Sequence, residues 1–176
     1  NFYYHLVLLA ENNKGYDNLI KIVSYGFKDG FYYKPRVDIE LLEKYHEGII
    51  ALSACLAGPV ARTIIRQGYD KAKEVALRYN NIFGENNFFL ELQDHMDGSV
   101  DQQTVNQSLM RMHQETGIPL VATNDCHYIS PEDAEAHDIL LCIQTNTTVD
   151  EADRMRYEGG QYYVKSPEEM YSLFPY

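Results

Sequence analysis

Residues 120–128 read LVATNDCHY and are the most informative stretch of the sequence. Its apolar start is followed at once by polar residues, which is typical of a buried strand ending at a functional edge. Residues two apart on an extended backbone point the same way, so Asp125 and His127 should project together. A carboxylate beside an imidazole suits a divalent metal of the zinc, manganese or iron type. The stretch therefore predicts a metal site, although Asn124-Asp125 is also turn chemistry that could make local hydrogen bonds instead.

Strand-like and helix-like segments alternate on both sides of this stretch. The expected strands are residues 2–10, 48–53, 87–92 and 120–123. The expected helices are residues 13–27, 38–45, 56–66, 70–83, 101–116 and 131–143. Alternation of this kind predicts an α/β fold of mostly parallel strands with crossover helices. After residue 145 the alternation breaks, with a turn at Gly159-Gly160, a short strand at residues 161–164 and a helical turn capped by Ser166.

Composition places the chain among intracellular globular domains. Its 176 residues are 45% hydrophobic, enough for one domain with a core, and no apolar run reaches the roughly 18 residues of a membrane helix. Its three cysteines lack paired spacing, which favours a reducing compartment, the cytoplasm. The net charge of −11 disfavours a broad grip on duplex DNA, but bound cations would reverse the sign of a local pocket.

Two further metal donors stand near predicted strands. Cys55 follows the second strand, at the edge where parallel α/β folds gather functional groups, and His5 lies within the first strand. With Asp125 and His127 they would form a set of one thiolate, two imidazoles and one carboxylate. Taken alone, His5 also fits a hydrogen-bonded core histidine and Cys55 a small buried hydrophobe.

Other polar residues are weaker candidates. His95 follows the third strand and could line the same mouth or sit in a surface loop. His137 lies on a predicted helix, either behind the metal ligands or on a solvated face. The basic and aromatic group at residues 32–36, which includes Arg36, could receive a phosphate or stack on a base.

Several long motifs carry a family resemblance across nearly the whole chain. They are HLVLLAENNKGYDNL (5–19), GFYYKPRVD (30–38), IIALSACLAGPV (49–60), FFLELQDH (88–95), PLVATNDCHY (119–128), AHDILLCIQT (136–145) and QYYVKSPEEM (161–170). In this order they resemble the PHP (polymerase and histidinol phosphatase) domain of bacterial DNA polymerase III alpha subunits. One departure is Pro59, where the family usually places an acidic residue, and it puts the helix geometry near Cys55 in question.

The resemblance implies an irregular seven-stranded (β/α)7 barrel with a multinuclear metal site at its mouth. By motif position it implies that His5, Cys55, Asp125 and His127 are metal ligands, with Asp125 and His127 also catalytic. Arg36, His95 and His137 are then candidates for contacts behind the ligands or with a phosphate. The family's opening His-x-His segment and its further acidic ligands do not match any part of this sequence. The resemblance therefore implies an incomplete barrel, with residues 1–145 the later part of the PHP domain and residues 146–176 an exit segment toward a polymerase core.

The activity implied is that of a replicative polymerase subunit. Divalent zinc, manganese or iron would serve a phosphoesterase site of 3′-to-5′ exonuclease type, and Mg²⁺ would serve a separate polymerase site. The implied partners are DNA, a sliding clamp and a proofreading subunit, with no membrane. Two alternatives remain: a metal-poor scaffold or docking domain of the polymerase, and a free-standing PHP phosphoesterase acting on small phosphates.

Overall fold

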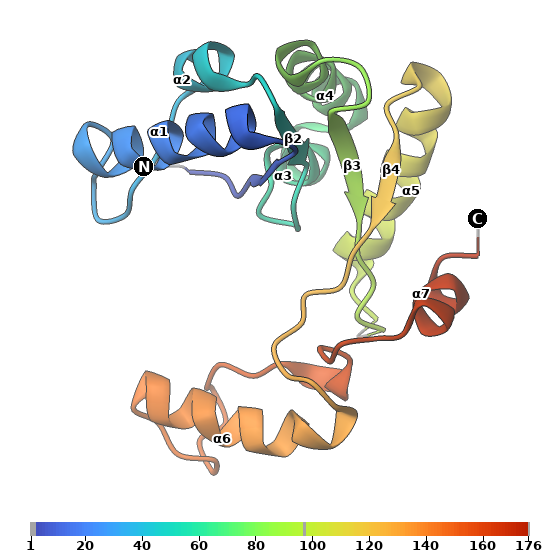
Figure 1. Cartoon of the computed structure of the whole chain (residues 1–176). Helices are drawn as coiled ribbons and strands as arrows, with labels where there is room; N and C mark the ends of the chain where they lie inside the picture. The colour runs from blue at the N-terminus through green and yellow to red at the C-terminus, as the bar shows by residue number, and fades with distance from the viewer. Residues whose placement is uncertain (1–2, 97, 176) are drawn as a thin grey trace. The chain divides into compact units, whose positions relative to one another are not determined.

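A computed structural model describes residues 3–96 and 98–175 of the chain (Figure 1). Asn1, Phe2 and Tyr176, at which predicted segments begin or end, lie outside the described residues. The chain divides into two compact units. The first comprises Asn1–Leu92 and Thr104–Val121, and the second comprises Gln93–Gln103 and Ala122–Tyr176.

The first unit is built on a mixed four-stranded sheet. Its strands, in spatial order, are β1 (Val7–Ala10), β2 (Ile49–Leu52), β3 (Phe88–Leu92) and β4 (Leu120–Ala122). β2 runs parallel to β3, and the arrows of β3 and β4 point the same way in Figure 1. β1 runs antiparallel to β2, with Val7 opposite Leu52. The α/β class and the crossover helices agree with the sequence prediction, whereas the first strand departs from the mostly parallel pattern.

Five helices connect or flank the strands. They are α1 (Asn13–Lys28), α2 (Ile39–Tyr45), α3 (Pro59–Gln67), α4 (Tyr69–Phe83) and α5 (Val100–Thr116). Asp38 caps α2 as predicted, because its carboxylate accepts a hydrogen bond of 2.9 Å from the Leu41 N–H. Pro59 occupies the first turn of α3, where its missing N–H costs nothing, so the departure at this position leaves the helix intact.

The core of this unit lies where α4 covers β3 and β2. Phe88 and Leu90 of β3 are fully buried, and the small residues Ala72 and Ala76 let α4 approach them closely. The Tyr79 ring stacks on Phe88 with their centroids 5.6 Å apart. Burying each large side chain contributes about 1.5–3 kcal/mol, so truncating Phe88 would damage the sheet most.

The opposite end of the sheet is less covered. β1 is an edge strand, and α1 packs on it with Gly15, Asn18, Ile22 and Gly26 buried. The apolar stripe that identifies α1 in the sequence faces outward instead, with about half of each side chain exposed at Tyr16, Ile20, Val23 and Phe27. The period of the stripe predicted the helix, but the inner face of the helix consists largely of small residues that allow close packing.

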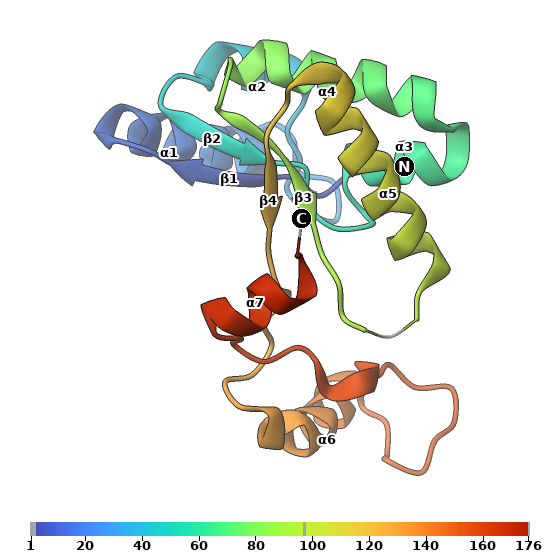
Figure 2. The same ribbon diagram turned by 90° about the vertical axis from the view of Figure 1, so that its right-hand side faces the viewer.

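In the part of the second unit that begins at Ala122, the described residues form two helices and two short 3₁₀ turns. They are η1 (Pro131–Asp133), α6 (Ala134–Thr145), η2 (Glu158–Gly160) and α7 (Pro167–Leu173). Ser130 and Ser166 each open a helical segment with a capping box, as expected from Ser-Pro at these points (Figure 2 shows α6 and α7). The strand predicted at residues 161–164 is reduced to one parallel bridge between Tyr128 and Tyr163. Within the described ranges, no helix is long and apolar enough to cross a membrane.

Candidate metal centre

The first unit brings His5 and Cys55 together. His5 precedes β1 rather than lying within it, which corrects the sequence prediction of a mid-strand histidine. Because β1 is antiparallel to β2, the start of β1 meets the end of β2, and Cys55 follows β2. The Cys55 sulfur lies 3.6 Å from the ring atom Nδ1 of His5. The backbone N–H of His5 donates a hydrogen bond of 3.1 Å to the Ala57 carbonyl. The reversed first strand is therefore what places this imidazole beside the thiol.

A buried carboxylate holds the turn that presents Cys55. Ala54 has φ of +63°, a left-handed conformation that costs free energy for a residue with a side chain. The Glu91 side chain on β3, only 5% exposed, accepts a hydrogen bond of 2.9 Å from the Ala54 N–H. The Glu91 N–H in turn donates to the Ser53 hydroxyl at 2.8 Å. Glu91 therefore binds Ser53 and Ala54, the two residues between the end of β2 and Cys55.

Gly58 closes the same turn. Its N–H donates to the Cys55 carbonyl at 2.7 Å. A Cβ at this position would lie 2.0 Å from the Ser53 carbonyl oxygen, far inside contact distance. Only glycine allows this close approach. The SACLAG sequence (residues 53–58) therefore supplies both the tight turn and the candidate metal donor Cys55.

The second unit holds Asp125 and His127 side by side after β4, as their spacing predicted. Oδ2 of Asp125 lies 3.2 Å from Nε2 of His127, with 49% and 29% of their side chains exposed. The neighbouring Cys126 turns away and donates its thiol to the Tyr163 carbonyl at 3.4 Å. The pair is thus accessible, and the intervening cysteine has a structural contact.

Residues 161–163 bind the backbone that carries this pair. The His127 N–H donates to the Tyr162 carbonyl at 2.7 Å. The Asn124 side-chain amide donates to the carbonyls of Gln161 and Tyr163, at 3.3 and 2.7 Å. The carboxy-terminal segment therefore acts as a strap over the Asp-x-His stretch, a role that the sequence did not reveal.

Aromatic rings surround His127 within this unit. Its ring centroid lies 4.2 Å from Tyr157 and 5.4 Å from His137. Tyr157 also contacts Tyr162, on which His95 stacks at 4.4 Å. Burial raises the pKa of Tyr157, with a further contribution from the Asp125 carboxylate, so its hydroxyl stays protonated near neutral pH. For both His95 and His137 a place near the site was one of two predicted positions, and both belong to the packing around His127.

An ion pair anchors the loop that delivers Tyr157. The Arg154 guanidinium, 4% exposed, donates two hydrogen bonds to the Asp138 carboxylate on α6, one of them 2.6 Å long. These hydrogen bonds hold the pKa of Asp138 below its usual range. Asp138 therefore stays ionised near neutral pH. Its two hydrogen bonds with Arg154 fix the start of the loop that carries Tyr157.

The spacing within each pair fits metal donors. Two ligands on one tetrahedral zinc would stand about 3.6 Å apart for sulfur with nitrogen and about 3.4 Å apart for nitrogen with oxygen. The observed separations are 3.6 and 3.2 Å. The pairs belong to different compact units, and within residues 3–96 and 98–175 no group of three or more ligand side chains gathers at one point.

Arg36 lies in the first unit on the loop after α1. Its guanidinium carbon is 5.0 Å from the centre of the Tyr32 ring. Lys34 lies over the ring of Tyr3 at 5.5 Å, and Tyr3 stacks on His5 at 6.3 Å. The basic and aromatic group that the sequence singled out therefore adjoins the thiol–imidazole pair through Tyr3.

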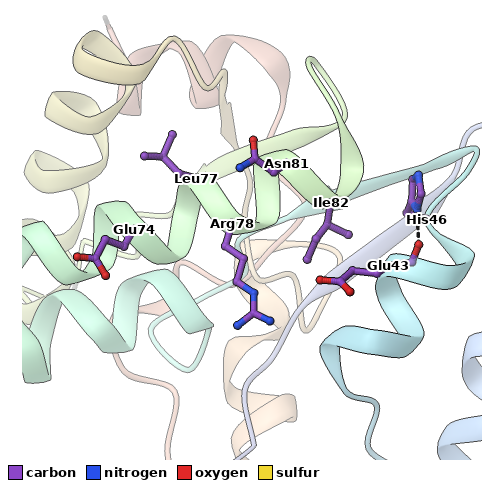
Figure 3. Close-up of a pocket in the computed structure, with 7 residues that line it drawn as sticks. All are labelled: Glu43, His46, Glu74, Leu77, Arg78, Asn81 and Ile82. Atoms are coloured by element: carbon purple, nitrogen blue, oxygen red, sulfur yellow. Dashed lines mark hydrogen bonds between the residues drawn. The ribbon is translucent and has the colours of Figure 1, made fainter.

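A separate hollow of about 680 Å³ lies between α2 and α4 (Figure 3). Glu43, His46, Glu74, Arg78 and Asn81 supply its polar lining. His46 Nδ1 is 2.7 Å from the Glu43 carbonyl oxygen, at the end of α2. None of the four predicted ligands lines this hollow, so it is distinct from the candidate metal centre.

Sequence reasoning missed two contributors to the site. Glu91 carried a usable signal, since a glutamate inside the apolar strand FFLEL must find a partner when buried. Tyr157 carried none, because its contact with His127 depends on how the chain returns after α6.

Comparison with known proteins agrees with the family resemblance seen in the sequence motifs. Residues 1–95 match the PHP domain family. The chain is 46% identical over 171 residues to DNA polymerase III subunit alpha of Borreliella burgdorferi, covering 97% of this chain and 15% of that protein. It is 44% identical to the Treponema pallidum protein of the same name over 99% of the chain, and 43% identical to that of Thermus aquaticus over 98%.

These relatives are far longer than the sequence described. The chain spans about 15% of the Borreliella and Treponema proteins and about 14% of the Thermus protein. The family match covers more than half of the chain and contains both His5 and Cys55. The chain belongs to the PHP domain family.

Proposed function

We propose that this chain is part of a DNA polymerase III alpha subunit and carries a metal-dependent phosphoesterase site of 3′-to-5′ exonuclease type. Family membership and 40–46% identity to proteins of that name support the first half of the proposal. The donor spacing within the two ligand pairs supports the second half and is the observation on which it rests.

The proposed ligands are His5, Cys55, Asp125 and His127. Divalent ions of the zinc, manganese or iron type, when bound, would acidify a water molecule and polarise a phosphodiester. Cys55 and His5 would supply soft and borderline donors, while Asp125 would supply a hard oxygen and align the His127 imidazole. The strap at residues 161–163 would keep the Asp-x-His pair in register.

We also propose that the sheet belongs to a larger PHP barrel. The free edge of β1 and the exposed apolar face of α1 are surfaces that further strands and helices of such a barrel would cover. In this proposal residues 1–145 belong to the barrel and residues 146–176 lead toward the polymerase core. The strap at residues 161–163 then belongs to the segment that leads toward the polymerase core, and it binds the Asp-x-His stretch of the barrel.

The partners follow from the same assignment. DNA would be the substrate, and the sliding clamp and a proofreading subunit would be neighbours in a cytoplasmic replicase that uses Mg²⁺ at its separate polymerase site. The Borreliella and Treponema proteins align over 97% and 99% of the chain, which favours a polymerase subunit over a free-standing phosphoesterase.

The test is metal content together with nuclease activity in the full-length protein. Wild type should retain zinc, manganese or iron after gel filtration and remove nucleotides from a 3′ end, and Asp125→Asn should lose both properties. Asp133→Asn, which alters a capping carboxylate on η1, is the matched control. Equal metal content in wild type and Asp125→Asn would refute the site, and a metal-free, inactive wild type would identify the domain as a scaffold.

A further inference from the structure

The loop after α1 exposes a basic and aromatic surface on an otherwise acidic chain. Residues 31–36 read FYYKPR, whereas the whole chain carries a net charge of −11. Three consecutive aromatic side chains are exposed, by 58% at Phe31, 49% at Tyr32 and 85% at Tyr33. Three exposed rings in succession form a contiguous patch, and a contiguous apolar patch marks an interaction site more often than a single exposed ring does.

The backbone of this loop is held in an unfavourable conformation. Tyr33 has φ of +60°, and the Tyr32 N–H donates to the Lys34 carbonyl at 3.1 Å, which closes the turn. A left-handed conformation is costly for a bulky aromatic residue. The turn projects the Tyr33 ring outward and sets it edge-on to Tyr32, with ring centroids 4.7 Å apart. Strain that displays a side chain, rather than burying it, points to a role in binding.

The two cations of the loop are available to a ligand. Across the described residues, neither Lys34 nor Arg36 forms an ion pair with a carboxylate. They lie instead over the faces of Tyr3 and Tyr32. The nearest acidic neighbour in the chain, Asp38, is already engaged in capping α2. Cations placed on aromatic rings keep their charge for an anionic partner.

The position of the loop connects it to the candidate metal centre. Tyr3 contacts Lys34 on one side and stacks on His5 on the other. Tyr3 thus joins the loop to the thiol–imidazole pair. All of these residues belong to the first unit.

We propose that the loop of residues 31–36 binds single-stranded DNA next to the metal centre, with unpaired bases on Tyr32 and Tyr33 and backbone phosphates on Lys34 and Arg36. The inference rests on the proposed function and adds a preference for unpaired over duplex substrate. Only unpaired bases expose the faces that stack on aromatic rings. The acidic charge of the rest of the chain disfavours a duplex, which would need a broad basic surface.

The experiment uses photocrosslinking, because it reports the site of contact even in a full-length protein with other DNA-binding surfaces. The probe is a short oligothymidylate with iododeoxyuridine near its 3′ end, irradiated in EDTA so that bound metal is not required. Trypsin does not cut between Lys34 and Pro35, so the expected adduct lies on the peptide of residues 29–36. Adducts confined to other peptides would overturn the proposal.

Titrating the oligonucleotide against the full-length protein, with the adduct yield on the peptide of residues 29–36 as the readout, gives the magnitude. Tyr33→Ala should weaken binding of the same oligonucleotide by about 5- to 150-fold, the usual effect of removing one stacking platform. Tyr33→Gly should weaken it equally while leaving stability unchanged or higher, because glycine tolerates the left-handed backbone. Tyr171→Ala, which removes a 77% exposed tyrosine from the second unit, should bind like wild type. Unchanged binding in both Tyr33 variants would overturn the proposal.

This design separates the loop from the metal centre. Asp125→Asn should leave crosslinking at residues 29–36 intact, since the assay contains no metal. If wild type proves inactive but the adduct forms, the nuclease assignment fails and the loop assignment stands. If wild type is an active nuclease and the adduct is absent, the loop assignment fails alone.

Discussion

The Cys55 sulfur and Nδ1 of His5 lie 3.6 Å apart, although 50 positions separate them in the chain. The contact exists because β1 runs antiparallel to β2, so that residues before one strand meet residues after the other. Both side chains are accessible, and their separation equals that of a sulfur and a nitrogen on one tetrahedral ion. This pair is the half of the proposed site that the first unit supplies.

Cys55→Ser should lower zinc affinity. Loss of a residue that only hydrogen-bonds to a metal ligand costs about 10- to 100-fold in metal affinity. Loss of the thiolate ligand itself should therefore cost at least as much. The measurement is a competition titration with a chromophoric chelator on the full-length protein. Cys126→Ser is the control, since that thiol contacts the Tyr163 carbonyl rather than the pair. Equal affinities for wild type and Cys55→Ser would remove Cys55 from the ligand set.

Glu91→Ala should destabilise the fold and disturb Cys55. The change leaves the Ala54 N–H without its acceptor in a buried turn, which costs about 1–3 kcal/mol of unfolding free energy. Urea denaturation measures this loss, and Glu85→Ala, at an exposed position, should stay near wild type. If both variants unfold at the same urea concentration, Glu91 does not hold the turn.

Tyr157→Ala should weaken metal binding without unfolding the second unit. Its ring is the nearest aromatic contact of His127, so its loss frees the imidazole to rotate. We expect about 10- to 100-fold lower metal affinity, while Tyr157→Phe, which keeps the ring, should retain wild-type affinity. Equal metal affinity in Tyr157→Ala and wild type would show that the Tyr157 ring does not hold the His127 imidazole in place.

Glu115→Gln should change the acid stability of the first unit. Hydrogen bonds from Lys73, Tyr69 and Arg111 lower the pKa of Glu115 from its usual 4.5 to about 2. A depressed carboxyl pKa contributes stability above about pH 4.5, and this contribution is lost as the pH falls toward about 2. Wild type should therefore lose more stability than the variant over that range, as followed by circular dichroism in urea.

The control for this pH effect is Glu85→Gln, an exposed carboxyl outside the network. Its stability should follow wild type from pH 5 down to about 2. Parallel curves for wild type and Glu115→Gln would show that the Lys73–Glu115–Arg111 network does not stabilise the fold.

The sequence predicted the elements of this fold better than their arrangement. Helical periodicity and caps such as Asp38 and Ser166 are local, and they located the helices to within a few residues. The direction of β1 is a property of the whole sheet, so the local pattern could not reveal it. The strand predicted at residues 161–164 failed for the same reason, since these residues bond to the Asp-x-His stretch instead of extending a sheet.

The candidate site shows the same contrast between local patterns, which the sequence predicts, and long-range contacts, which it does not. Asp125 and His127 were predicted as a pair because period-two spacing is a local geometric fact, and the structure brings them together. His5 was placed in mid-strand, and only the antiparallel pairing explains its contact with Cys55. Tyr157 reaches His127 through the return of the chain after α6, which no short motif encodes.

The most direct test is a crystal structure of the full-length protein soaked with zinc, with anomalous diffraction recorded at the zinc edge. We expect anomalous peaks within about 2.0–2.3 Å of donor atoms of His5, Cys55, Asp125 and His127, clustered about 3.5–4 Å from one another. Zinc bound to one pair alone, with the other pair remote from every peak, would contradict the claim that the four residues form one metal centre.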